Sequence, residues 1–423
     1  MLLGLLLLFV FLLIIGVPVF YILSSLAVYY IYILDLPLKM IPQRFVAGAD
    51  SFVLLAVPFF ILAGELMNNS GITTRIFDFC SKLVGHIKGG LGHVNILASI
   101  IFSGMSGSAL ADAAGLGLVE VKAMVDAGWH KEDAAAVTVA SATIGPIIPP
   151  SIPLVIYGVV AEQSIGRLFL GGVIPGLLLG ITMMVLVYII AGRKNFPVQT
   201  RASLKSIFSS FISASPALLM PVFILGFIAL GITSPTEAGL VAVAYSLILG
   251  FFIYKELTLA NFMKALNNTV KTTTTIMIIV CAANLLGWVI TIQRAADVLA
   301  TYTLSITENP VLILLAVNLL LIVVGCFMES ISALLIFVPL LLPVLTSIGI
   351  DPIHFGVVMV LNLMIGLVTP PFGMSVFVMG KVANLSPEII FRSTLIYYIP
   401  LFGTLLLVTL FPSLVTWIPN LLF

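Results

Sequence analysis

Two short segments hold small polar residues in otherwise apolar surroundings, and their residue types and spacing suit the binding of an ion or an anion. Residues 102–109 read Phe102-Ser-Gly-Met-Ser-Gly-Ser-Ala109, and residues 143–151 read Thr143-Ile-Gly-Pro-Ile-Ile-Pro-Pro-Ser151. Serine hydroxyls are small oxygen ligands, and glycine permits close backbone approach. The second segment has three prolines within five positions, which prevents a regular helix because proline lacks an N–H group and clashes with the preceding turn.

Irregular backbone in apolar surroundings must find partners, because an unpaired carbonyl or N–H group in hydrocarbon costs several kcal/mol. Free carbonyls can coordinate a hard cation such as Na⁺, and free N–H groups at the start of a helix can hold a carboxylate. We therefore expect the carbonyls near Gly145 and Ile148 to face the tip at residues 103–106. Ser151 is expected to begin a helix that can meet an anion. Packing of helices through small residues is the alternative interpretation of the first segment.

A second pair of segments repeats this pattern. Residues 325–330 read Gly325-Cys-Phe-Met-Glu-Ser330, and residues 366–374 read Gly366-Leu-Val-Thr-Pro-Pro-Phe-Gly-Met374. The motif Gly-x-x-x-Pro-Pro recurs after 221 residues (366 − 145 = 221). Gly104 with Gly325 and Gly128 with Gly349 keep the same separation. This constant spacing indicates an internal repeat, and repeats with matched broken helices mark the binding sites of secondary transporters.

Glu329 distinguishes the second tip from the first. At the same offset, Ser106 and Ser108 correspond to Phe327 and Glu329. A charge at the centre of a membrane helix costs about 2.5–3.5 kcal/mol on insertion scales. We therefore expect Glu329 to face a cavity, an ion or a hydrogen-bond donor, with a hairpin end close to water as the alternative.

The composition indicates which solvent surrounds the chain. Of the 423 residues, 61% are hydrophobic and 8% are charged, against roughly 25% charged in a soluble domain. Lipid must therefore cover most of the surface. The net charge of +1 gives no electrostatic basis for binding nucleic acid. The sequence contains no nucleotide-phosphate motif, hydrolase elbow or metal-enzyme cluster, so we expect no enzyme.

Hydrophobic segments follow one another along the whole chain, and a spanning helix needs about 20 apolar residues. The expected spans are residues 2–34 (broken near Gly16 and Pro18), 52–67, 172–191, 208–232, 238–254, 272–292, 311–326 and 393–410. Shorter segments between them predict re-entrant hairpins at about 95–125 and 311–345, and unwound crossings at 143–151 and 366–374. Residues 72–93 and 255–271 look like amphipathic interfacial helices, and the Thr272–Thr275 run is interpreted as helix packing.

These segments predict an all-α polytopic membrane protein. The first repeat spans residues 1–192 and the second spans 208–423. Between them, residues 193–207 form a linker that carries Arg193, Lys194, Arg201 and Lys205. The positive-inside rule places this linker in the cytoplasm.

The two tips and the two Pro-Pro segments resemble those of the large membrane subunit of tripartite ATP-independent periplasmic (TRAP) transporters. The resemblance covers nearly the whole chain. It implies a multi-pass protein of the bacterial inner membrane, with two inverted repeats and an elevator-type transport domain moving against a scaffold. It also implies two partners, a small four-helix membrane subunit and a periplasmic substrate-binding protein. Because the chain starts directly at a large-subunit helix, we expect the small subunit to be a separate chain.

The resemblance further implies uptake of an organic acid with Na⁺ as the coupling ion and no organic cofactor. Sialic acid is the first candidate and a C4-dicarboxylate the alternative. Carried over by position, one Na⁺ site would involve Ser103, Ser106, Gly145 and Ile148, and its counterpart would involve Gly325, Gly366 and Thr369. The substrate would lie near Ser106, Ser108, Ser151, Glu329 and Gly373.

Three other functions compete with this hypothesis. A stand-alone divalent-anion/Na⁺ symporter would take up substrate without a binding protein. A membrane-embedded enzyme would need a catalytic constellation that the sequence lacks. A channel fits poorly, because paired broken hairpins suit an occluded site better than an open pore.

Overall fold

The computed structural model describes residues 4, 8–9, 11–13, 15–194 and 196–423, and within these ranges every regular element is a helix. The side chains of residues 104–106 and 296 lie outside the description. Seven of the described helices are long and apolar enough to cross a membrane. An eighth span results if the pair Met40–Ala49 and Phe52–Asn68, bent by 51°, is counted as one. The prediction of an all-helical polytopic membrane protein is therefore confirmed.

The first half of the chain contains breaks at the predicted hairpin tip near residue 107 and at the predicted crossing at 143–151. The expected break near Gly16 and Pro18 is present, because α2 begins directly after Pro18. The helices of this half are α2 (Val19–Ile33), α3 (Met40–Ala49), α4 (Ala56–Asn68), α5 (Ile72–Val84), α6 (Gly90–Ser106), α7 (Ala109–Ala114), α8 (Leu116–Asp126), α9 (Lys131–Ser141), α10 (Ile152–Val160) and α11 (Ile165–Lys194). The 3₁₀ turns η1 (Phe52–Leu55) and η2 (Ala142–Ile144) join them.

The second half begins after an extended linker that ends at Ser203. Its helices are α12 (Leu204–Ala229), α13 (Pro235–Ile248, continued by the π-helical turn η3, Leu249–Ile253), α14 (Leu259–Ile292), α15 (Ala295–Ile306), α16 (Pro310–Phe327), α17 (Ser330–Ser347), α18 (Pro352–Gly366), α19 (Met374–Ala383), α20 (Pro387–Thr394), α21 (Tyr398–Leu410) and α22 (Ser413–Leu422). The 3₁₀ turn η4 (Leu395–Tyr397) joins α20 to α21.

The two predicted interfacial helices, at 72–93 and 255–271, have other bounds in the structure. Residues 255–271 do not form a separate helix, because α14 runs unbroken from Leu259 to Ile292. Lys264, Asn267 and Lys271 of its first half are exposed, whereas Ala265 and Thr269 are buried. The helix predicted at 72–93 ends at Val84, and after a turn α6 starts at Gly90, where Gly89 and Gly90 adopt positive φ angles.

Helix starts in the two halves keep the 221-residue spacing of the sequence motifs. α7 and α17 begin 221 residues apart (330 − 109 = 221), and so do α9 and α18 (352 − 131 = 221). α10 and α19 begin 222 residues apart (374 − 152 = 222). The bent pair α3 and α4 occupies the positions that correspond to the single helix α14. The helix pattern of the chain thus recurs along its length.

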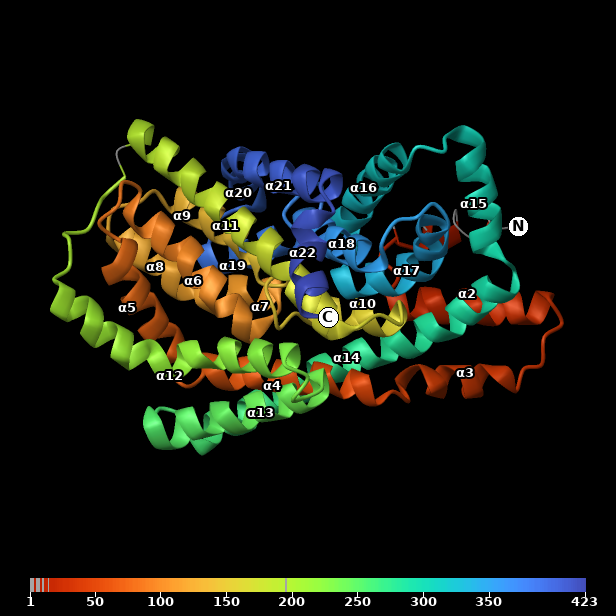
Figure 1. The fold of residues 1–423 in the computed structure, drawn as a ribbon, viewed down its shortest axis with the longest axis horizontal. Coiled ribbons are helices and arrows are strands. Elements are labelled where there is room, and N and C mark those ends of the chain that lie inside the picture. Colours follow the sequence, from red (N-terminus) through yellow and green to blue (C-terminus); the bar gives the residue numbers. More distant parts are fainter. Residues whose placement is uncertain (1–3, 5–7, 10, 14, 195) are drawn as a thin grey trace.

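The two halves are interlocked around a helical core. In α18 all residues from Ile353 to Gly366 are buried, and α9 is buried from Asp133 to Ser141. α10 of the first half packs against α17 of the second, and α19 of the second packs against α7 of the first. Along one side of the molecule, α14 packs against α2, α3 and α4 (Figure 1). We call hairpin 1 the unit α6–α8 and hairpin 2 the unit α16–α17.

Candidate functional site

The tip of hairpin 1 is a tight turn between two helices. α6 ends at Ser106, Gly107 follows with φ +60°, and Ser108 caps α7 by accepting a hydrogen bond from the N–H of Ala111 (3.4 Å). A Cβ atom on Gly107 would lie 2.7 Å from the carbonyl oxygen of Pro150. This close approach requires glycine. It places the tip directly against the first unwound crossing.

The first unwound crossing is compact rather than open. After α9 the chain forms the turn η2, passes through a cis Pro149–Pro150 bond and enters α10 at Ser151. The Ser151 hydroxyl caps α10 by accepting from Leu154 N–H (3.2 Å) and donates to the carbonyl of Pro146. Ser151 therefore satisfies backbone groups at both ends of the turn.

At the tip of hairpin 2, a carboxylate takes the place of a serine cap. Glu329 caps α17, accepting hydrogen bonds from the N–H groups of Ile331 (2.9 Å) and Ser332 (3.3 Å). The hydroxyl of Ser330 donates a third bond to Glu329 (2.9 Å). Negative charge at a helix N-terminus is favourable. Three hydrogen-bond donors thus offset the cost of placing Glu329 here. This agrees with the expectation that Glu329 faces a donor.

The second unwound crossing contacts hairpin 2 through two glycines. A Cβ atom on Gly366 would lie 2.5 Å from the Cα of Gly325, so the two backbones touch. Thr369 donates its hydroxyl hydrogen to the Ile365 carbonyl (2.7 Å), and the Tyr398 hydroxyl donates to the Val368 carbonyl (2.8 Å). The Pro370–Pro371 bond is cis, as in the first crossing.

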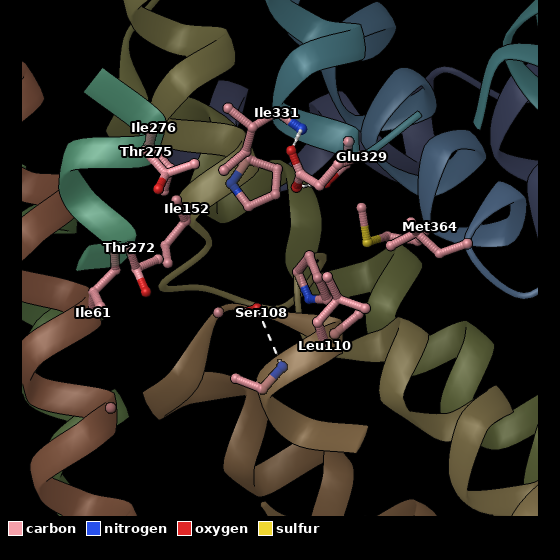
Figure 2. Close-up of a pocket in the computed structure, with 18 of the residues that line it drawn as sticks. Ile61, Ser108, Leu110, Ile152, Thr272, Thr275, Ile276, Glu329, Ile331 and Met364 are labelled. Carbon is pink, nitrogen blue, oxygen red and sulfur yellow. Dashed lines mark hydrogen bonds between the residues drawn. The ribbon is translucent and has the colours of Figure 1, made fainter. Parts of the chain in front are cut away.

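A cavity of about 540 Å³ lies between the two hairpin tips and the wall formed by α4 and α14. Figure 2 shows Ser108 and Glu329 on opposite sides of it, with Thr272 and Thr275 on α14. From the tips and crossings, residues 107–111, Pro146, Ile152, Pro153, residues 329–332, Met364 and Leu367 line it, and from the wall Ile61, Gly64, Glu65, Asn68, Thr272, Thr275, Ile276 and Ile279. These lining residues include two carboxylates, Glu65 and Glu329, and no lysine, arginine or histidine.

The predicted substrate residues are partly gathered at this cavity. Ser108 and Glu329 line it. Ser151 is fully buried behind Ile152 and Pro153, which do line it. Gly373 does not line it, because it turns the chain into α19 with φ +40° against the ring of Phe391. The side chain of Ser106 lies outside the described residues.

The predicted ion residues fall into two groups. In the second group the structure brings Gly325 and Gly366 into contact, with Thr369 three residues further along. In the first group, Ser103 is buried and its hydroxyl donates to the Ser99 carbonyl. Gly145 lies against the Asp112 carboxyl group, and the Ile148 side chain packs over Gly176. Among the described residues, no cluster of three or more His, Cys, Asp or Glu side chains could hold a metal ion.

The sequence analysis missed the wall that faces the tips. Thr272 and Thr275, interpreted as packing residues, line the cavity. Glu65 and Asn68 line it from α4, and the Glu65 carboxylate accepts a weak hydrogen bond from Asn268 on α14 (3.3 Å). The sequence signal for this wall is the Glu65 carboxylate and the threonine run, because both are polar within apolar helices.

A sequence model described as "Tripartite ATP-independent periplasmic transporter, DctM component" matches residues 5–414. The chain belongs to this family. It is a multi-pass membrane permease of a bacterial TRAP transporter and not an enzyme. Membership in a TRAP system implies that a periplasmic binding protein works with it.

Curated relatives cover most of this TRAP permease. The sialic acid TRAP transporter large permease protein SiaM of Vibrio cholerae is 49% identical over 379 residues, which are 90% of this chain and 89% of the relative. The sialic acid TRAP transporter permease protein SiaT of Haemophilus influenzae is 44% identical over 90% of this chain and 62% of its own length. The C4-dicarboxylate TRAP transporter large permease protein DctM of Pseudomonas aeruginosa is 38% identical over 88% of this chain and 87% of its own.

A solved membrane transporter shares the fold. The YdaH transporter of Alcanivorax borkumensis aligns with a TM-score of 0.67 over 96% of this chain and 98% of that chain, at 14% sequence identity. At this identity, the likeness concerns the helical architecture alone.

Proposed function

We propose that this permease performs Na⁺-coupled uptake of an organic acid across the bacterial inner membrane. A periplasmic binding protein delivers the substrate, and a small four-helix membrane subunit completes the membrane part. The observation that carries the proposal is the cavity between two capped hairpin tips, whose described lining residues include helix N-termini and hydroxyls but no basic side chain. The permease family supplies the context of a three-part transporter.

An acid substrate in this cavity needs positive charge that the lining side chains do not supply. The start of α10 offers the N–H group of Ile152, since Pro153 has none and that of Leu154 bonds to Ser151, and Ser108 offers a hydroxyl. Glu65 and Glu329 add negative charge, so co-bound cations would balance both the protein and the substrate. Each positive charge moved inward gains about 2.3 kcal/mol per 100 mV. A monoanion with two or more Na⁺ ions would therefore be driven inward by the membrane potential.

We propose two Na⁺ sites beside the tips. The first would use Ser103, Ser106, Gly145 and Ile148, and the second Gly325, Gly366 and Thr369. The support is positional, since each set joins one hairpin tip to the crossing that follows it in the same repeat. The compact tips also suit an elevator mechanism in which both hairpins, the crossings and the bound ligands move together past α4 and α14. We propose that the two repeats are inverted relative to each other.

Sialic acid is the preferred substrate, and the carboxylates of the cavity are the physical reason. A polyhydroxylated acid with an amide group presents O–H and N–H donors that Glu65 and Glu329 can accept. A C4-dicarboxylate would instead bring a second negative charge toward them. The relative with 49% identity is named for sialic acid, and a relative named for C4-dicarboxylates is 38% identical.

Replacing Na⁺ with K⁺ is expected to stop uptake. Proteoliposomes that contain both membrane subunits, supplied with the binding protein and labelled sialic acid, should accumulate the acid only with an inward Na⁺ gradient. Uptake that is unchanged in K⁺ would disprove Na⁺ coupling. Uptake without the binding protein would favour the alternative, a stand-alone divalent-anion/Na⁺ symporter.

Ser108→Ala is expected to raise the substrate concentration needed for half-maximal uptake by about tenfold, because hydrogen bonds to charged groups contribute about 1.5–3 kcal/mol. Ser203→Ala is the matched control. Ser203 caps α12 in the same way, accepting from Ser206 N–H (3.2 Å), but lies in the linker away from the cavity. Both variants should lose a similar amount of thermal stability. An equal effect of the two variants on uptake would remove Ser108 from the substrate site.

A further inference from the structure

The carboxyl group of Glu120 is buried inside hairpin 1, outside the cavity. Glu120 on α8 is 1% exposed, and α8 packs against α6, α7, α9 and α19. One carboxyl oxygen, Oε2, accepts a hydrogen bond from the side-chain amide of Asn95 (2.9 Å). The other oxygen, Oε1, is buried without a hydrogen-bond partner.

Asn95 connects Glu120 to a chain of buried polar groups. Its amide also donates to the Thr138 hydroxyl (2.7 Å), and its carbonyl accepts from the Ser141 hydroxyl (2.6 Å). The Ser99 hydroxyl donates to Ser141 (3.1 Å). Within this network of described residues, Oε1 of Glu120 is the one side-chain polar atom without a hydrogen-bond partner.

In the part of the chain that the structure describes, Glu120 forms no ion pair with a basic side chain. The carboxyl group of Asp112 on α7 interacts with it electrostatically, and the neutral thiol of Cys80 on α5 also lies near it. Among the described residues, α6, α9 and α19 bring Asn95, Thr138 and Met379 to this region. An ionised carboxylate buried without a cation costs several kcal/mol or more. A group that binds Oε1 must therefore cancel a negative charge.

Packing decides which ligand fits. A Cβ atom on Gly117, one turn before Glu120, would lie 3.1 Å from Met379 and 3.1 Å from Thr138. These helices are therefore closely packed beside Glu120, and the described residues contain no group of three or more His, Cys, Asp or Glu side chains that could hold a metal ion. A proton is the one cation that needs no additional volume. We propose that Glu120 is a proton-binding site that keeps hairpin 1 neutral in this region.

Helix α6 connects the Glu120 site to the proposed first Na⁺ site at the tip of hairpin 1. Asn95, Ser99 and Ser103 are spaced four residues apart on α6, so they share one face of the helix. Ser103 donates to the Ser99 carbonyl, and Ser103 belongs to the proposed first Na⁺ site, on which this step rests. Loss of the proton would place a charge beside Asn95 and disturb this face. Uptake should then decline toward alkaline pH.

Infrared spectroscopy of the purified membrane complex tests the proton site without transport. The wild type should show the C=O stretch of a protonated carboxylic acid at neutral pH, shifted in D₂O, and Glu120→Gln should remove that band. The band should disappear as the pH rises, together with thermal stability, since a folded state that holds the proton more tightly loses stability when the proton leaves. The wild-type titration is decisive even if the variant does not fold.

Glu132→Gln is the matched control, because Glu132 is an exposed carboxylate at the start of the neighbouring helix α9. It should leave the band and the pH profile unchanged. In sialic acid uptake, Glu120→Gln should abolish the alkaline decline and retain Na⁺ dependence. An absent band in the wild type would overturn the proposal. So would a tenfold loss of Na⁺ affinity in Glu120→Gln, because that result would identify an ionised cation ligand.

Discussion

Gly366→Ala is expected to reduce uptake by more than about tenfold while the protein still inserts into the membrane. The new methyl group would lie 2.5 Å from the Cα of Gly325, and backbone atoms on both sides cannot swing away as a flexible side chain can. Overpacking of this kind costs about 1–3 kcal/mol. The structure can relieve it only by separating hairpin 2 from the second unwound crossing, which carries the proposed second Na⁺ site.

Na⁺ titration of uptake in proteoliposomes, combined with thermal unfolding of the purified complex, measures this effect. Gly287→Ala is the matched control, because no atom lies within 4 Å of a Cβ atom built on that glycine of α14. It should leave uptake intact, and alanine is the better helix former by about 1 kcal/mol. Wild-type Na⁺ affinity in Gly366→Ala would show that the contact of the two glycines is not needed for ion binding.

The repeat and the broken elements could be predicted because their signals are local. Three prolines within five positions interrupt a helix because each lacks an N–H group, and Gly107 ends α6 with a positive φ angle. The constant offset between the two Pro-Pro motifs then paired the segments. The structure adds that whole helices, such as α9 and α18, begin at the same spacing.

The opposite wall of the cavity could not be predicted in this way. Glu65 and Thr272 lie about two hundred residues apart, and they share a cavity only because α4 packs against α14. Nothing in either sequence segment shows which face of these apolar helices meets the hairpins. The hydroxyls of the run Thr272–Thr275 also suit helix packing. The sequence therefore gives no reason to place Thr272 and Thr275 in the cavity.

The predicted helix bounds differ from the structure where polar residues suggest the end of a membrane helix. Residues 255–271 contain lysines and asparagines, yet α14 passes through them because no proline or glycine interrupts it there. Conversely, α5 ends at Val84 before Gly85, and α6 starts at Gly89 and Gly90, whose positive φ angles favour glycine. Backbone chemistry located these boundaries better than hydropathy did.

Glu329 illustrates the limit for a single side chain. Its cost in a membrane helix predicted a cavity, an ion or a donor, and the structure supplies both donors and a cavity. The N-cap role was not predicted, since serine, threonine, aspartate and asparagine are the usual caps. Position by position, Glu329 replaces Ser108 (329 − 108 = 221), so both tips cap their outgoing helix.

Glu329→Ala is expected to reduce uptake by about a hundredfold. Loss of an N-cap costs about 0.5–2 kcal/mol, and the cavity would also lose an acceptor for substrate O–H or N–H groups. Asp351→Ala is the matched control, because Asp351 caps α18 with the same pattern, accepting from Ile353 N–H (2.7 Å) and His354 N–H (3.1 Å), and does not line the cavity. The thermal destabilisation of the two variants should be similar. If uptake also fell equally, Glu329 would be a structural cap and nothing more.

Glu329→Gln separates charge from capping. The amide oxygen can still accept from Ile331 N–H, so α17 should stay capped and thermal stability should change little. Removal of the negative charge lowers the repulsion that a second carboxylate would meet, and specificity is a difference between two affinities. A C4-dicarboxylate should therefore compete with labelled sialic acid more strongly in Glu329→Gln than in the wild type. If competition is unchanged, the charge of Glu329 does not select the substrate, and the helix N-termini and the α4–α14 wall would have to make that choice.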